Sequence, residues 1–232
     1  MSSPDAVSAE DIVQIWEQGR RHHPIDRALT ILAVLSRQPR AELAAISVEG
    51  RDRMLLAWRC RIFGDDLAGY AACPACGCGV DVAVSPRGLT EPEEHFTVDV
   101  EGCPVAVRLP NSLDLAAIVG CESVEAARAM LISRCVDAGE ADCSEQDIAL
   151  IEAELGRRAE VSAATLALTC PNCGNGWKLE LDVAAFAWRE IDILAGRLLR
   201  QVDELARRYG WSEREILSLS SARRRFYLEL AS

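Results

Sequence analysis

The chain lacks the apolar segments that direct a protein into or across a membrane. It contains no apolar run of about 18 residues, the length that a membrane-spanning helix requires. The first residues, Met1-Ser2-Ser3-Pro4-Asp5, show no basic segment followed by an apolar one, so they do not match a secretory signal. We therefore expect a cytoplasmic protein that makes no contact with a membrane.

Catalytic motifs are lacking as well. The sequence has no Gly-x-Ser-x-Gly, no glycine-rich phosphate-binding loop and no His-Glu-x-x-His. It has only three histidines, and two of them, His22 and His23, precede Pro24, where the start of a helix accounts for them. We therefore expect no enzymatic activity and no small-molecule substrate.

Positive charge is scarce over most of the chain. The net charge is −11, whereas residues 183–232 hold nine arginines against seven acids and so carry about +2. The remaining residues therefore carry −13. Such an acidic body repels nucleic acid and keeps the chain soluble, so we do not expect nucleic acid as a partner.

What the chain does have is cysteine, ten residues in all, and four of them form two matching pairs. Cys73-Pro74-Ala75-Cys76-Gly77 and Cys170-Pro171-Asn172-Cys173-Gly174 are both Cys-Pro-x-Cys-Gly and both lie between short strand-like runs. Each pair has the form of one half of a four-cysteine zinc ribbon, in which four thiolates surround one ion at about 2.3 Å. We expect Cys73, Cys76, Cys170 and Cys173 to bind a structural Zn²⁺ ion.

These cysteines are also compatible with other interpretations. A Cys-Pro-x-Cys pair also occurs in thioredoxin-like redox sites, but there it begins a helix after a strand. An iron–sulfur cluster would use the same four thiolates. Cys78, two positions after Cys76, could compete as a ligand, although the symmetry of the two pairs leaves it out. The cysteines without ligand spacing are expected to be mostly buried small side chains; they are Cys60, Cys103, Cys121, Cys135 and Cys143.

The remaining sequence alternates between helical and strand-like patterns, which predicts a helix-rich α+β fold. A capping box at Ser8–Asp11, Pro24 at a first helical position and Asn111 at a helix start mark three of the helices. Helices are expected from Ser8, over 24–38, 51–63, 111–119, 122–136, 144–155, 183–208, 212–217 and 221–230. Strands are expected at 68–72, 80–84, 96–100, 105–109, 165–169 and 177–182, with 101–104 as the turn of a hairpin.

The zinc ribbon is expected to organise the chain, because its halves enclose an inserted hairpin and helices. We predict an N-terminal helical segment (1–66), the first knuckle with a β-hairpin (67–110), inserted helices (111–161), the second knuckle (162–182) and a C-terminal helical segment (183–232). The long helix of that last segment carries a continuous apolar stripe, which is most often core-facing. Large apolar side chains beside it exceed what a small ribbon needs, so we predict that part of this surface docks a partner; the candidate residues are Trp188, Trp211, Phe226 and Tyr227.

Several stretches of the sequence together resemble a known family, the baseplate hub assembly chaperones of T-even-type phages, in the form found beside contractile phage-tail-like injection systems. These stretches are 16–19, 23–29, 109–116, 170–174 with 186–191, 209–217 and 221–230. The resemblance covers most of the chain and is strongest over 166–230. Its metal ligands correspond to the four paired cysteines, and Cys78 is not required by the pattern. The resemblance implies a non-enzymatic factor that holds a tail or baseplate hub component in the cytoplasm of the producing cell.

Two functions of other classes remain open. A zinc-ribbon regulator that binds nucleic acid would use Arg223-Arg224-Arg225, which otherwise form a solvated helix face. A thiol-redox protein would cycle a disulfide between Cys73 and Cys76.

Overall fold

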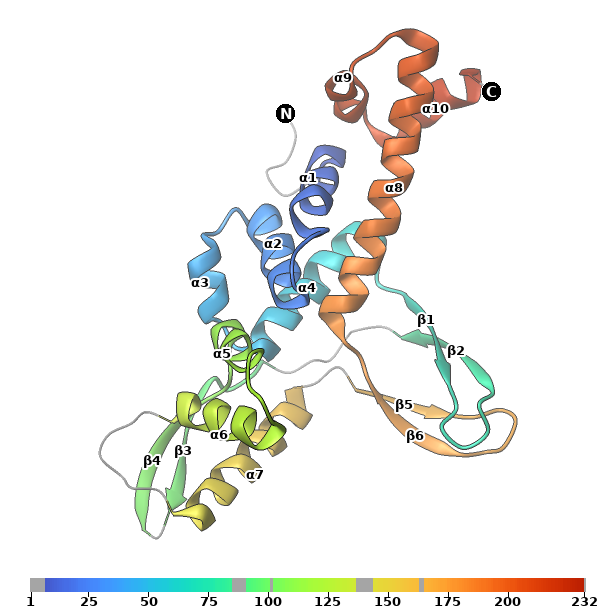
Figure 1. The fold of residues 1–232 in the computed structure, drawn as a ribbon. Helices are drawn as coiled ribbons and strands as arrows, with labels where there is room; N and C mark the ends of the chain where they lie inside the picture. The colour runs from blue at the N-terminus through green and yellow to red at the C-terminus, as the bar shows by residue number, and fades with distance from the viewer. Residues whose placement is uncertain (1–6, 85–90, 101, 137–143, 163–164, 232) are drawn as a thin grey trace. The chain divides into compact units, whose positions relative to one another are not determined.

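The structure, a computed structural model, describes residues 7–84, 91–100, 102–136, 144–162 and 165–231 (Figure 1). Over these residues it is helix-rich with small antiparallel sheets, which confirms the α+β prediction. The helices are α1 (Ala9–Gly19), α2 (Pro24–Ser36), α3 (Arg40–Ala45), α4 (Val48–Phe63), α5 (Ser112–Ile118), α6 (Val124–Cys135), α7 (Glu145–Ser162), α8 (Val183–Tyr209), α9 (Glu213–Ser218) and α10 (Ser221–Ala231). The strands are β1 (Leu67–Ala72), β2 (Gly79–Val84), β3 (His95–Val100), β4 (Cys103–Arg108), β5 (Thr165–Thr169) and β6 (Gly176–Glu180).

The chain divides into two compact units. Residues Met1–Arg40 and Ala184–Ser232 form one, here called the terminal unit, and Ala41–Val183 form the other, the central unit. From the sequence, the terminal unit holds fourteen arginines against twelve acids, a net charge of +2, and the central unit therefore carries −13. In the described part of either unit, every helix is too short or too polar to span a bilayer.

Local hydrogen bonds explain where the helices of the terminal unit begin. Ser8 and Asp11 form the expected capping box, since the Asp11 N–H donates to the Ser8 hydroxyl at 3.0 Å and the Ser8 N–H donates to the Asp11 carboxylate at 3.0 Å. His23 precedes α2 as its N-cap and Pro24 is the first helical residue, as predicted. The long helix α8 of the same unit ends before Gly210. The φ of Gly210 is +70°, a left-handed conformation that glycine adopts at no steric cost.

The apolar stripe of α8 is buried within the terminal unit. Ala187, Ile191, Ala195, Leu198 and Leu205 are each at most 4 % exposed. This burial shows that the stripe predicted for the C-terminal helix is largely core. The helix α1 buries one face, and α2 is buried on nearly all sides from Ala28 to Leu35.

Tryptophan side chains fix α8 against α1. Trp16 donates its indole N–H to the Asp192 carboxylate at 2.7 Å. Trp188 lies directly over Gly19, where an added Cβ would come within 2.4 Å of the indole ring. A glycine is therefore required at that crossing because only the absence of a side chain lets the ring approach.

The central unit is built on three separate antiparallel hairpins, β1–β2, β3–β4 and β5–β6. The β3–β4 hairpin packs against α6 and α7, and their shared core includes Phe96, Val107, Ile132, Cys135 and Ile151. Figure 1 shows α6 and α7 beside this hairpin, and the β1–β2 and β5–β6 hairpins as a second pair.

Several predicted boundaries were wrong. Val100 pairs directly with Cys103, so Cys103 and Pro104 belong to β4 rather than to the turn. The helix α4 begins at Val48 because the Ser47 hydroxyl accepts the Gly50 N–H at 3.1 Å, three residues before the predicted start. The helix α7 continues beyond residue 155 to residue 162, and the short helix α3 was not predicted.

Candidate metal centre

The two Cys-Pro-x-Cys-Gly segments fold into matching loops. Each lies in the turn of a hairpin, the first between β1 and β2 and the second between β5 and β6. In the first loop the Gly77 N–H donates to the Cys73 carbonyl at 2.9 Å, and in the second the Gly174 N–H donates to the Cys170 carbonyl at the same distance. Both glycines have a positive φ, +71° and +74°. This conformation disfavours other residues and explains the glycine after each pair.

The four thiols of these loops converge on one point. The sulfur atoms of Cys73, Cys76, Cys170 and Cys173 all lie within 4.8 Å of one another. Across the two loops, Cys73 Sγ is 3.7 Å from Cys173 Sγ, and Cys76 Sγ is 3.6 Å from Cys170 Sγ. A tetrahedron with metal–sulfur bonds of about 2.3 Å has edges of about 3.8 Å. The thiols are therefore close enough to bind one metal ion with these four as its ligands.

The four thiols differ in burial, and one of them accepts a hydrogen bond from a side chain. Cys73 and Cys170 are buried at 2 % and 1 % exposure, and Cys76 and Cys173 are exposed. The Asn172 amide donates to Cys76 Sγ at 3.7 Å, a contact that orients the thiolate from outside the ligand set.

The hydrogen bonds of the loops also favour ionised sulfur at two positions. Hydrogen bonds with the backbone of Cys173, and also of Asn172, lower the pKa of Cys170 to about 6. The pKa of Cys76 is lowered chiefly by a backbone hydrogen bond from Cys78. Although a backbone hydrogen bond with Asn175 lowers it, side-chain hydrogen bonds with Cys76 and Cys170 raise the pKa of Cys173 to about 12. The thiolate is the form that binds metals, and within this cluster Cys170 and Cys76 reach that form most readily.

Cys78 lies outside the group of four. Its thiol donates to the Gly79 carbonyl at 3.5 Å, and burial together with the neighbouring Cys170 raises its pKa. Of the other cysteines, Cys135 is fully buried, Cys103 is exposed, and Cys60 and Cys121 are half-buried. Cys143 lies outside the described residues.

The predicted partner-binding residues lie in two places within the terminal unit. Trp188 is half-buried over Gly19, with the Arg27 guanidinium 4.8 Å from its ring centroid. The other three belong to an aromatic cluster, in which Trp211 stacks on Tyr209 at 4.7 Å and meets Tyr227 edge-on at 4.9 Å. Phe226 adjoins Tyr227 and is 57 % exposed. Tyr209, the last residue of α8, also belongs to this cluster and was not among the predicted partner-binding residues.

The three consecutive arginines of α10 are not equivalent. Arg224 is 6 % exposed and donates to Gln201 at 2.8 Å and to the Leu219 carbonyl at 3.2 Å. Arg223 and Arg225 are exposed. The middle arginine therefore ties α10 to the end of α8 and to the chain after α9.

The Asn111–Asp114 segment, which contributed to the family resemblance, forms a buried polar network. Asp114 is fully buried, caps α5 with Asn111, and accepts two hydrogen bonds from Arg108 at 2.6 and 3.0 Å. Arg134 adds a third at 2.8 Å. Although burial alone would raise the pKa of Asp114, these donors lower it.

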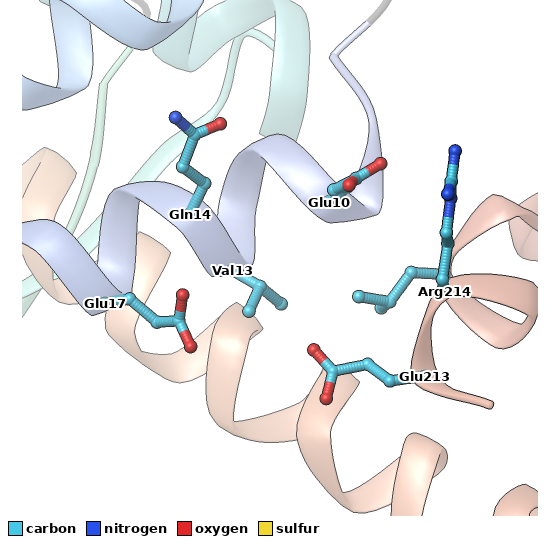
Figure 2. Close-up of a pocket in the computed structure, with 7 residues that line it drawn as sticks. Glu10, Val13, Gln14, Glu17, Glu213 and Arg214 are labelled. Carbon is cyan, nitrogen blue, oxygen red and sulfur yellow. The ribbon is translucent and has the colours of Figure 1, made fainter.

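A groove also lies within the terminal unit, between α1 and α9 (Figure 2). Glu10, Glu17 and Glu213 surround it with Arg214, while Val13 lies nearly buried at its base. The carboxylates here are exposed, and among the described residues only the four cysteines lie close enough together to hold a metal ion.

Comparisons with known proteins give no relative. No protein-family model, no curated protein and no solved structure matches this chain. The function must therefore be argued from the residues and their geometry.

Proposed function

We propose that this protein is a non-enzymatic assembly chaperone for a phage-type tail or baseplate hub, acting by protein–protein binding on a scaffold held by Zn²⁺. The observation that carries the proposal is the convergence of four thiols from loops that lie far apart in the sequence. Zinc is the metal that such an all-sulfur tetrahedral set most often holds, and four protein ligands leave no position for water or substrate. The metal is then structural.

The ligand set supports a structural role in a second way. Cys76 and Cys170 are 94 positions apart, so one ion joins the segment before the inserted hairpin to the segment after α7. Binding of zinc to such sites contributes on the order of 10 kcal/mol, and here it acts as folding free energy for the central unit.

The assignment to tail assembly comes from the sequence resemblance. The aromatic cluster near the C-terminus supplies a surface that could bind a partner protein. In this cluster the rings of Tyr209, Trp211 and Tyr227 pack against one another. Phe226 contacts Tyr227 and is exposed. Aromatic anchors supported by packed neighbours are the usual centres of protein interfaces.

Affinity purification of the tagged chain from its native cell, followed by mass spectrometry, tests this proposal. We expect a tail or baseplate hub component to co-purify, and Phe226→Asp to remove it. Ile193→Asp is the matched control, since Ile193 is an exposed apolar residue of the same unit outside the cluster. Co-purification of enzymes alone, or of no tail component, would contradict the proposal.

A nucleic-acid-binding regulator is the second candidate, and the exposed Arg223 and Arg225 are the observation that favours it. With Arg224 engaged inside the unit, two side chains remain for phosphate contact. A titration of duplex DNA at two salt concentrations separates the two functions, because binding through several phosphates weakens steeply with salt. A thiol-redox role is less favoured, since both cysteine pairs lead into the strands β2 and β6 rather than into helices.

A further inference from the structure

The described part of the central unit contains an apolar groove that none of the functions above uses. It has a volume of about 390 Å³ and lies between α6 and α7, with the end of α5 at one side. Its walls are formed by side chains such as Val124, Leu131, Ile132 and Leu155. Arg128 and Glu152, which form an ion pair, are its charged lining residues.

Exposed apolar side chains are frequent among residues 113–161. Among the described residues, six of the ten large apolar side chains that are exposed belong to residues 113–161, and Val124 at the groove is 79 % exposed. They are Leu113, Val119, Val124, Met130, Leu150 and Val161. Of these six, Val124 lines the groove, where it leaves an apolar side chain open to a partner.

Small residues determine what shape can enter the groove. Ala127, Gly156 and Ala159 line it, and an added Cβ at Gly156 would meet nothing within 4 Å. Short side chains on two neighbouring helices let the backbone of a third helix approach closely. The groove therefore suits an amphipathic helix, which inserts apolar side chains at successive turns.

Charge around the groove identifies the character of that helix. The described residues in and next to α6 and α7, 122–136 and 144–162, include seven acids and four arginines. All four arginines are paired within the unit: Arg128 with Glu152, Arg134 with Asp114, and Arg157 and Arg158 with Glu154. The local cations are thus neutralised.

The surplus acids are available on the surface of the same helices. Glu122, Glu125 and Glu160 are exposed on or next to α6 and α7. Hydrogen bonds with its own backbone and with Ser123 lower the pKa of Glu125, so this carboxylate is charged at neutral pH. An incoming helix is therefore complementary if it carries arginine or lysine beside its apolar face.

We propose that the α6–α7 groove binds a basic amphipathic helix of a partner protein, with apolar side chains in the groove and arginine or lysine facing the carboxylates of α6 and α7. This proposal rests on the proposed function only in taking the partner to be the assembly client. It adds to the proposed function the chemical character of the client segment that the groove binds.

Synthetic peptides test the proposal on the full-length protein. The probe is a helical peptide of about 18 residues, or five turns, with leucine on one face and arginine on the other. One comparison peptide replaces arginine by glutamate, and another scrambles the order so that no apolar face forms. By fluorescence anisotropy we expect the first peptide to bind about tenfold or more tightly than either comparison, a difference of about 1.4 kcal/mol.

Variants of the groove locate the binding. Gly156→Leu fills the groove, and it should preserve the fold because the position is an open helical one. We expect it to weaken peptide binding at least about tenfold, or about 1.4 kcal/mol. Gly156→Ala controls for helix propensity, and Gly196→Leu on α8 controls for an added leucine on a different helix; both should leave binding unchanged.

Any of three results would overturn the proposal. These are equal binding of the glutamate or scrambled peptide, binding that is unaffected by Gly156→Leu, and self-association of the protein that Gly156→Leu abolishes, which would make a second copy the occupant. Failure of the tail component to co-purify, with peptide binding intact, would instead overturn only the proposed function.

Discussion

The buried carboxylate of Asp114 shows how one side chain can hold several segments. It accepts hydrogen bonds from Arg108 at the end of β4 and from Arg134 near the end of α6, and it caps α5. Removal of Asp114 leaves Arg108 and Arg134, whose side chains are 27 % and 41 % exposed, without this buried partner, which costs more than the loss of a fully exposed pair.

Asp114→Asn is therefore expected to lower the free energy of unfolding by about 3 kcal/mol. Asp203→Asn is the matched control, because the Asp203–Arg207 pair is 60 % and 79 % exposed and should contribute less than about 1 kcal/mol. Urea unfolding followed by circular dichroism measures both. Equal effects of the two changes would show that the Asp114 network does not stabilise the fold.

The same carboxylate predicts a dependence on acidity. Its pKa in the folded chain is lower than the ordinary value of 3.8, since the donors from Arg108 and Asn111 outweigh burial. Its stabilising effect is therefore complete above pH 3.8 and is lost as pH falls further, through the folded pKa. The stability difference between the wild type and Asp114→Asn should shrink below about pH 4, and a difference that is constant down to pH 2 would contradict this.

The crossing of Gly19 and Trp188 gives a second prediction. An alanine Cβ at position 19 would lie 2.4 Å from the indole, so Gly19→Ala should destabilise the terminal unit by roughly 1–3 kcal/mol. Gly196→Ala, on α8, meets only the Arg200 guanidinium at 3.8 Å and should stabilise by up to about 1 kcal/mol. The midpoint temperatures of thermal unfolding of the two variants should shift in opposite directions relative to the wild type. A shift in the same direction would show that the crossing is not tightly packed.

Helices and hairpins were predictable from the sequence wherever their signals are local. The capping boxes at Ser8, Asn111 and Ser212 correctly mark the starts of α1, α5 and α9. Gly210, with its positive φ, follows the end of α8 at Tyr209, one residue past the predicted end. The start of α4 was wrong by three residues because the cap, Ser47, precedes a stretch without a clear apolar pattern.

What could not be predicted depends on contacts between distant segments. The pairing of Cys73 with Cys173 and of Cys76 with Cys170 follows from three-dimensional proximity, although the two motifs indicated which four thiols to expect. Nothing in the Arg223–Arg225 run distinguishes its middle member, yet Arg224 alone is buried. The groove between α6 and α7 has no sequence motif, since its walls are ordinary helical residues.

The two knuckle hairpins should depend on each other through the metal. Cys170→Ser removes one of four ligands, so we expect loss of bound metal and loss of solubility together, because distant segments share the site. Cys103→Ser is the control, as Cys103 is exposed and lies outside the cluster. If Cys170→Ser unfolds at the wild-type temperature, the metal does not hold the fold together.

The chain as a whole combines an acidic central unit with a slightly basic terminal unit, and the two offer different surfaces to partners. In our account one ion contributes to the stability of the central unit, and binding surfaces rather than a reaction define the activity. The thiol cluster leaves no open coordination position once four ligands are bound. The account therefore depends first on that ion being present and being zinc.

The presence and identity of the ion are tested most directly on freshly purified protein kept under reductant. The measurement is native mass spectrometry combined with elemental analysis. The account predicts one zinc ion per chain, bound through the thiols of Cys73, Cys76, Cys170 and Cys173. Protein that is folded and carries no metal, or that carries iron with sulfide, would contradict it.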